Sequence, residues 1–394
     1  MQWASTVSTE PLLERAVAQA TAALRSQLSA SQADLMVAFA SHHHAAQFDR
    51  LPEFVKAEAA VGVLVGASAG GVIGGGREIE QHPGLSLTAA VLPNVELTGF
   101  HVEAHGVPED EAPAAWQALT GVSAARAPHF VLLPDPFSFD AEAFIKGLDR
   151  TYPDSRKIGG LASGGQQPGT NALFLDGTVY RSGLVGVALA GDVQVDTIVA
   201  QGCRPVGQPM FATKCQRNIL CELDGEPAVK ALHDLYEQLD ASDQALAQHS
   251  LFVGIVMKRD RQEYGQGDFL IRNVIGIEPQ RGALAVGALL EENSVIQFHL
   301  RDSKTSAEDL DQLLGRYRDD AAYAPPHGAL LFSCLGRGIH LYGRPDHDTD
   351  AVRRYLGDLP LGGFFCNGEI GPVHDTTFLH GYTSAFGLFR SRKG

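Results

Sequence analysis

The sequence has 394 residues, 44% of them hydrophobic and 20% charged, a composition typical of a globular protein long enough for two domains. Its 31 Lys and Arg are outnumbered by 46 Asp and Glu. The resulting formal net charge of −15 repels phosphate backbones, so we expect no nucleic-acid partner. No apolar run approaches the roughly 20 residues that span a bilayer, and the N-terminus lacks the pattern of a signal peptide. We therefore expect a cytoplasmic protein without membrane insertion.

The cysteines support this assignment. There are five, an odd number, and no pair has C-x-x-C spacing. They are Cys203, Cys215, Cys221, Cys334 and Cys366. Such usage in a long chain indicates reduced intracellular thiols rather than a disulfide framework.

The first part of the chain predicts alternating strands and helices. Pro52 must start or break one of the helices, and Pro93-Asn94 predicts a hairpin turn between the last two strands. In order, the expected elements are a strand at 3–8, a helix at 11–28, a strand at 34–40, a helix at 46–59 and strands at 61–67, 85–92 and 95–102.

This order of elements then repeats twice. The second set is a helix at 110–119, a strand at 129–133, a helix at 141–151 and strands at 157–161, 172–175 and 184–189. The third set is a helix at 307–318, a strand at 329–332, a helix at 348–356 and strands at 361–365 and 378–389. The fold class is therefore α/β (α+β), with mixed sheets, helices on their outer faces and a degenerate α-β-α-β-turn-β unit.

A cluster of turn residues at 202–207 (GCRPVG) indicates a domain boundary. We expect two closely packed domains, 1–202 and 203–394. The section that follows the boundary predicts a partial variant of the repeat, with a helix at 227–239 and strands at 251–257, 269–277, 283–289 and 295–300.

Three apolar runs end in turns of small residues, at 61–76 (VGVLVGASAGGVIGGG), 157–165 (KIGGLASGG) and 361–371 (LGGFFCNGEIG). One interpretation is a ligand site, because backbone N–H groups and polar side chains converge at such turns. The other is a set of ordinary strand turns in which glycine permits close packing.

Several longer segments follow one another with a distinctive order and spacing. They are DLMVAFAS (34–41), LTAAVLP (87–93), DFLIRNVIGIEPQRGALAVG (268–287), VIQFHLRDSKTSAEDL (295–310), GALLFSCLGRG (328–338), GGFFCNGEIGPV (362–373) and FLHGYTSAFGLFR (378–390). Together they resemble the FIST family, whose members pair a FIST-N with a FIST-C domain. The resemblance covers nearly the whole chain and assigns 1–202 to FIST-N and 203–394 to FIST-C.

The resemblance implies a sensory module of signal transduction that binds a small molecule such as an amino acid or a derivative. Because no output domain is recognised in the sequence, a separate signalling protein would have to carry the output. The family offers two alternatives, a haem-based gas sensor and, from its F-box members, a protein-interaction adaptor. A Cys-dependent hydrolase is a further alternative.

The candidate ligand-binding residues lie at the turns. Glu369 suits an ammonium or guanidinium group, while Asn367 and the turn N–H groups suit a carboxylate, as a zwitterionic ligand requires. Both could instead satisfy nearby backbone groups. The remaining candidates are Cys366, Gly368, Cys334, Arg337, His380, Thr383, Ser68 and Ser163.

We expect no catalysis and no cofactor. The sequence shows neither a nucleophile elbow nor a protease signature around Cys334, Cys366 and His380. The only histidine cluster, at 42–44, is interpreted as a solvated loop rather than a metal site, and no C-x-x-C-H motif attaches haem.

Overall fold

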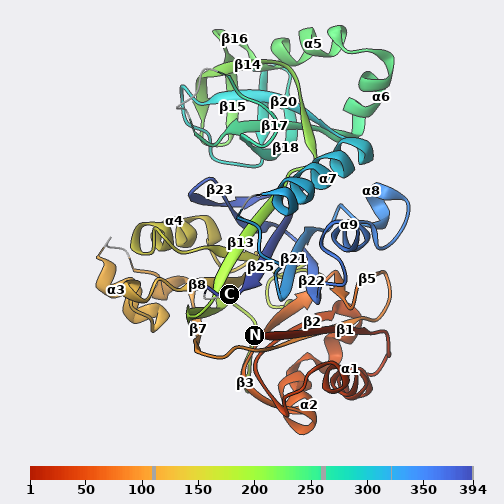
Figure 1. The fold of residues 1–394 in the computed structure, drawn as a ribbon. Coiled ribbons are helices and arrows are strands. Elements are labelled where there is room, and N and C mark those ends of the chain that lie inside the picture. The colour runs from red at the N-terminus through yellow and green to blue at the C-terminus, as the bar shows by residue number, and fades with distance from the viewer. Residues whose placement is uncertain (109–111, 259–262, 321, 393–394) are drawn as a thin grey trace. The chain divides into compact units, whose positions relative to one another are not determined.

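The computed structural model describes residues 1–108, 112–258, 263–320 and 322–392. It divides into two compact units (Figure 1): unit 1 is Met1–Val199 with Asp311–Gly394, and unit 2 is Ala200–Leu310. The first division falls close to the expected boundary at 202. Residues 311–394, however, belong to unit 1. The sequence analysis expected them in one domain with residues 203–310, which form most of unit 2.

Apart from residues 201–302, the described chain contains three copies of one order of elements, which confirms the expected repeat. The first copy is β1 (Gln2–Ser8), α1 (Leu13–Gln27), β2 (Gln32–Ser41), the 3₁₀ helix η1 (His42–Arg50), α2 (Leu51–Glu58), β3 (Ala60–Ala69), β4 (Gly71–Gly74), β5 (Arg77–Glu80) and β6 (Leu85–Val91). The second is β7 (Val95–Val102), α3 (Pro113–Thr120), β8 (His129–Pro134), α4 (Ala141–Thr151), β9 (Lys157–Gly160), β10 (Leu173–Leu175), β11 (Thr178–Tyr180) and β12 (Leu184–Gly191). The third is β13 (Gln194–Ala200), α7 (Ser303–Asp319), β21 (Gly328–Cys334), α8 (Ile339–Tyr342), α9 (His347–Leu356), β22 (Leu361–Cys366), β23 (Glu369–Val373), β24 (Thr376–His380) and β25 (Ser384–Arg390). The start expected at residue 110 for α3 lies outside the described residues.

The copies exchange hairpins. Each gives four strands to one six-stranded sheet, and the sheet orders are β1-β6-β2-β3-β10-β11, β24-β23-β9-β8-β12-β7 and β13-β25-β21-β22-β4-β5. Hairpin β4–β5 of the first copy extends the sheet of the third, β10–β11 of the second extends that of the first, and β23–β24 of the third extends that of the second. Each sheet has one parallel pair at its centre: β2–β3, β8–β9 or β21–β22.

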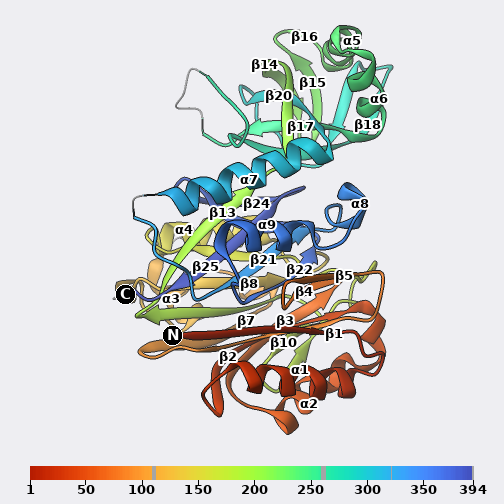
Figure 2. The same cartoon turned by 45° about the vertical axis from the view of Figure 1, so that its right-hand side comes forward.

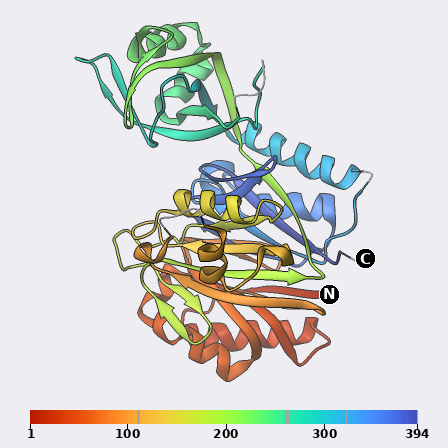
Figure 3. The same ribbon diagram turned by 90° about the vertical axis from the view of Figure 1, so that its left-hand side faces the viewer.

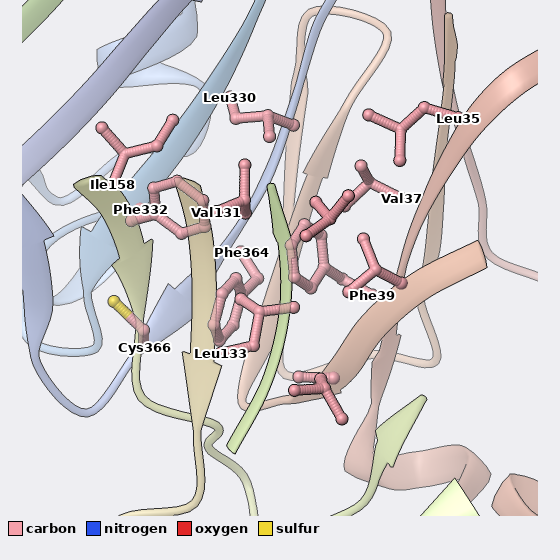
Figure 4. Packing of buried hydrophobic residues seen from close by; sticks show 14 of the residues in the cluster. Leu35, Val37, Phe39, Val131, Leu133, Ile158, Leu330, Phe332, Phe364 and Cys366 are labelled. Carbon is pink, nitrogen blue, oxygen red and sulfur yellow. The ribbon is translucent and has the colours of Figure 1, made fainter. Parts of the chain in front are cut away.

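The inner faces of the three sheets share one core (Figure 4). Strand β2 contributes Leu35, Val37 and Phe39, and Phe39 stacks on Phe364 of β22 with ring centroids 4.4 Å apart. The alternate residues of β2 face outward and are also buried. Burial on both faces explains why the central strands are continuous apolar runs in the sequence.

Helices cover the outer faces of the sheets. Figure 2 shows α1 and α2 side by side beneath the first sheet, where Leu13, Val17 and Phe54 pack against its buried residues. Helices α3 and α4 lie together in Figure 3, and Trp116 and Phe144 pack against the second sheet. No helix in the described ranges is both long enough and apolar enough to cross a membrane.

Unit 2 is a barrel with two helices rather than the expected variant of the repeat. Its elements are β14 (Cys203–Gln216), β15 (Ile219–Leu223), β16 (Glu226–Pro227), α5 (Ala228–Gln238), α6 (Ala241–Ser250), β17 (Leu251–Val256), β18 (Phe269–Glu278), β19 (Ala283–Val286) and β20 (Val295–Arg301). Its sheet order is β14-β20-β17-β18-β19-β15-β16, and an additional β14–β15 pairing closes it. The barrel is inserted between β13 and α7 of the third copy.

Two expected strand connections are wrong. Pro93-Asn94 does not close a hairpin, because β6 pairs with β1 and β2 while β7 pairs with β12 in another sheet. The strand expected at 378–389 is two strands, since β24 pairs with β23 and β25 pairs with β21. In both cases the short turn moves the chain from one sheet to another.

Candidate functional site

The turns that follow β3, β9 and β22 are hydrogen-bonded to one another at the carboxyl ends of these strands. We name residues 68–71, 161–165 and 366–369 the turn junction. Ligand sites of α/β proteins form at the carboxyl ends of parallel strands, because the loops there converge while the strands hold them rigidly. The junction therefore has the position expected of a binding site.

Ser163 connects the turns of all three copies. Its hydroxyl donates to the carbonyl oxygen of Phe365 over 2.5 Å and accepts from the backbone N–H of Gly70 over 2.8 Å. Its own N–H donates to the carbonyl oxygen of Ser68 over 3.1 Å. One fully buried side chain thus joins the first, second and third copies.

Ser68 continues this network into the first two copies. Its hydroxyl lies 3.2 Å from the carbonyl oxygen of Ser163 and 3.3 Å from Oδ1 of Asn171, and it accepts from the N–H of Ala172. The Asn171 amide donates to Asp135 over 3.0 Å. These four side chains are buried and hold the 162–171 loop against the end of β3.

Glu369 is the buried carboxyl group of the junction. Its side chain is 0% exposed, and Oε2 accepts from the N–H and the hydroxyl of Thr383 at 3.0 and 2.7 Å. Oε1 accepts from the Cys366 thiol at 3.6 Å. Burial and the neighbouring Glu369 raise the pKa of the Cys366 thiol well above its usual range. His380, the strand partner of Glu369, directs Nε2 to the carbonyl oxygen of Gly371 at 3.0 Å.

Asn367 is the junction side chain that reaches the surface. It is exposed, and its amide donates to the carbonyl oxygen of Ala162 over 3.3 Å. The adjoining Gly368 accepts from Leu161 through its carbonyl oxygen over 2.9 Å. The turn is therefore held by this amide and by backbone bonds, while the Asn367 side chain remains exposed to solvent.

The turn after β21 connects to the junction through the backbone, where Leu335 donates its N–H to the carbonyl oxygen of Cys366 over 3.1 Å. Cys334 donates its N–H to the carbonyl oxygen of Thr383 over 3.0 Å, and Arg337 donates its N–H to that of Cys334 over 2.9 Å. The Cys334 side chain is half-buried, and that of Arg337 is completely buried.

Arg337 forms a buried ion pair with Asp348 at the start of α9. Nε and Nη2 lie 3.0 and 3.1 Å from the two carboxylate oxygens, and Nη2 also donates to the Tyr342 hydroxyl. Burial opposes both charges, but the attraction between them holds the pKa of Asp348 below its usual range and that of Arg337 above its own. Ser384 donates a further hydrogen bond to Asp348 over 2.6 Å.

Glu78 of β5 is a second buried carboxyl group near α9. Oε1 accepts from the N–H of Thr349 over 2.9 Å, and the side chain is 4% exposed. Burial, followed by the charge of Asp348, raises the pKa of Glu78 to about 8. Glu78 of the first copy therefore contacts α9 of the third copy. In the folded protein its carboxyl group keeps its proton to about pH 8.

The structure brings the expected site residues into one connected network: Ser68, Ser163, Cys334, Arg337, Cys366, Asn367, Gly368, Glu369, His380 and Thr383. Most of their side chains are buried, and whether any binds a ligand stays a prediction. Sequence reasoning missed Asp135, Asn171 and Asp348. Asp135 follows an apolar strand directly, a signal that could have identified it, whereas Asp348 resembles an ordinary residue of a first helical turn.

The histidine cluster differs from the expected solvated loop. His42 and His43 are exposed, but His44 is buried within η1, which begins at His42. Burial and the neighbouring His43 lower the pKa of His44. Among the described residues, no group of three or more His, Cys, Asp or Glu side chains is arranged to hold a metal ion.

Two domain models match the chain, the FIST N domain over residues 34–226 and the FIST C domain over residues 228–372. The division between them lies inside the barrel of unit 2. A protein of Mycobacterium tuberculosis is 36% identical over 97% of this chain and 98% of its own length. One from Mycobacterium bovis is 34% identical over 97% of each chain. Human F-box only protein 22 is 31% identical over 22% of this chain and 25% of its own length.

Proposed function

This chain belongs to the FIST family, and on that premise we propose that it is a non-catalytic sensory protein that binds a small molecule, such as an amino acid or a derivative, at the turn junction. The Ser163 bridge is the observation that carries the proposal. A buried hydroxyl that joins three turns from distant parts of the chain gives the loops a fixed geometry. A preformed arrangement of polar groups reduces the ordering cost of binding.

The exposed amide of Asn367 is the group that we assign to ligand contact. An amide both donates and accepts hydrogen bonds, so it can bind the carboxylate or the amino group of an amino acid. Glu369 is completely buried and occupied by Thr383, so we assign it a positioning role, in which it holds the 366–369 turn in place. A change in ligand occupancy would then reach a separate signalling protein, the partner that carries the output.

Two features of the junction support binding without catalysis. The raised pKa of the Cys366 thiol disfavours the thiolate that a cysteine nucleophile needs. His380 directs Nε2 to a backbone carbonyl oxygen, whereas a Cys–His pair requires a nucleophile and a base in hydrogen-bond contact.

The experiment is a thermal-unfolding screen of the purified full chain against the individual proteinogenic amino acids, followed by calorimetric titration of those that raise the unfolding temperature. Asn367→Ala should unfold as the wild type does but bind at least tenfold more weakly, because its charge-assisted hydrogen bond is worth about 1.5–3 kcal/mol. The control is Gln248→Ala, which removes an exposed amide from α6 of unit 2. Equal binding by wild type and Asn367→Ala would refute the assigned contact.

A protein-interaction module is the second candidate function. Unit 2 exposes large apolar side chains on and near its barrel strands: Phe211, Ile275, Ile277 and Leu289. Exposed apolar groups of this size are enriched where proteins bind one another. If this function is the relevant one, Ile275→Ser with Ile277→Ser will abolish association with a copurifying protein, while Asn367→Ala will leave it unchanged.

A further inference from the structure

Cys334 and Cys366 are paired residues on neighbouring parallel strands. In the register of β21 and β22, Phe332 lies opposite Phe364 and Cys334 lies opposite Cys366. Both phenylalanines face the shared core, and because residues two apart on a strand share a face, both cysteines belong to that same face. After burial and Glu369, the charge of Cys334 contributes to the raised pKa of the Cys366 thiol.

The spacing suits a covalent link. Hydrogen-bonded strands lie about 4.8 Å apart, which is inside the range of about 4.4–6.8 Å between the Cα atoms of disulfide-bonded cysteines. The pairing therefore places the two cysteines opposite each other at the strand ends.

The two thiols differ in access to solvent. Cys334 is half-buried, and its sulfur accepts a hydrogen bond from the N–H of Gly336 over 3.4 Å. Cys366 is 0% exposed, and its thiol donates to the carbonyl oxygen of Ser333 and to Glu369. A small oxidant in solution can therefore reach Cys334 before it reaches Cys366.

We propose that Cys334 and Cys366 are a reversible redox pair that forms a cross-strand disulfide when hydrogen peroxide oxidises Cys334. The pair includes Cys366 of the turn junction, but the proposal does not rest on ligand binding there. The two residues differ in role. The accessible thiol of Cys334 reacts with peroxide, and the buried thiol of Cys366 then reacts with the oxidised Cys334 to form the disulfide.

The chemistry occurs in two balanced steps. The Cys334 thiolate attacks one oxygen of hydrogen peroxide, the O–O bond breaks, and the products are a sulfenic acid and hydroxide. Glu369, whose carboxylate accepts from the Cys366 thiol, takes the thiol proton, and the sulfur of Cys366 attacks the sulfur of Cys334. The S–O bond breaks, and the departing hydroxide takes that proton from Glu369 and leaves as water. Peroxide is reduced by two electrons, and each cysteine sulfur supplies one.

The disulfide removes one donor from the junction. Once oxidised, Cys366 has no S–H for Glu369 or for the carbonyl oxygen of Ser333. The ends of β21 and β22 also become covalently joined below the exposed Asn367.

The test is treatment of the reduced full chain with hydrogen peroxide, followed by alkylation of free thiols and non-reducing peptide mapping by mass spectrometry. The expected result is a peptide pair linked through Cys334 and Cys366, lighter by two hydrogen atoms, that dithiothreitol separates again. In Cys366→Ala, a sulfenic-acid probe should label Cys334, because no resolving thiol remains. In Cys334→Ser, Cys366 should remain a thiol at the same peroxide concentration.

Three outcomes would overturn the proposal: sulfinic acid at Cys334 of the wild type without the link, a link from either residue to another cysteine, or two unreacted thiols. Circular dichroism of the wild type and both variants shows whether each is folded. Cys215 and Cys221, which are half-buried in unit 2, serve as internal reference thiols, and the mapping resolves any link between them.

Discussion

The hydroxyl of Ser163 donates a hydrogen bond to the carbonyl oxygen of Phe365 over 2.5 Å, although the two residues are 202 positions apart. The bond joins the second copy of the repeat to the third, and the same hydroxyl accepts from Gly70 of the first. This arrangement requires the turns of all three copies to be in place together. The geometry of the turn junction is thus a property of the complete unit 1.

Ser163→Ala should destabilise the protein by about 1–3 kcal/mol, because it leaves the N–H of Gly70 and the carbonyl oxygen of Phe365 without this partner in a buried place. Urea unfolding followed by circular dichroism measures the change. Ser26→Ala is the control, since that exposed hydroxyl bonds only within α1. Equal unfolding midpoints for the two variants would show that the bridge contributes nothing.

Gly363→Ala should destabilise the fold by about 3 kcal/mol or more, because a Cβ atom there would lie 1.9 Å from the carbonyl oxygen of Leu331. The equivalent Gly159 would meet Leu132 at the same distance, so Gly159→Ala should behave alike. Gly177→Ala is the control, with open space around its added Cβ, and should change the free energy of unfolding by less than about 0.5 kcal/mol. A tolerated Gly363→Ala would argue against equivalent, tightly packed parallel pairs.

Asp348→Ala should cost about 3–5 kcal/mol of stability, because it leaves the guanidinium of Arg337 buried without its counter-charge. The comparison is Asp350→Ala on the same helix, whose exposed pairs with Arg344 and Arg353 are worth about 1 kcal/mol or less. Chemical denaturation of both variants gives the difference. Similar losses would mean that the buried pair is no stronger than a surface one.

Glu78→Gln should become more stable relative to the wild type as the pH rises. The unfolded carboxyl group loses its proton near its ordinary pKa of 4.5, whereas the folded one keeps it to about 8. Between these values the folded wild type binds more protons, so its stability falls with increasing pH, by at most about 1.4 kcal/mol per pH unit. Glutamine keeps the oxygen that accepts from Thr349 and has no proton to lose.

Unfolding titrations of both proteins from about pH 5 to about pH 8 test this sign. Asp346, Asp348 and Glu80 also face Glu78, and they remain in both proteins, so their contributions largely cancel in the difference. A difference in stability that stays constant across this range would contradict the raised pKa.

Local patterns in the sequence were sufficient for most elements and for the recurrence of their order. The helix expected at 141–151 matches α4, and the apolar run at 361–365 matches β22. The exchange of hairpins was not predictable, because pairing partners depend on the whole fold. Pro93-Asn94 has the composition of a hairpin turn, yet the strands it joins find better partners in separate sheets.

The candidate site was likewise predictable only in part from the sequence. Short polar motifs after apolar strands identified Ser68, Ser163 and Asn367, since chain position alone indicates the end of a strand. The sequence patterns did not show which of the site side chains would be buried. Glu369 was expected to meet a ligand, but the fold covers it completely and directs it to Thr383. Asn171 was missed because its bonds reach across a loop to Ser68 and Asp135.

Hydrogen–deuterium exchange of the full chain tests the central claim most directly, measured with and without an equimolar mixture of the proteinogenic amino acids. A ligand at the turn junction should slow amide exchange in the turns at 68–71, 161–165 and 366–369 of the wild type, and this protection should be lost in Asn367→Ala. The control variant Gln248→Ala should retain it. Protection confined to other segments, or unchanged exchange throughout, would contradict a ligand site at this junction.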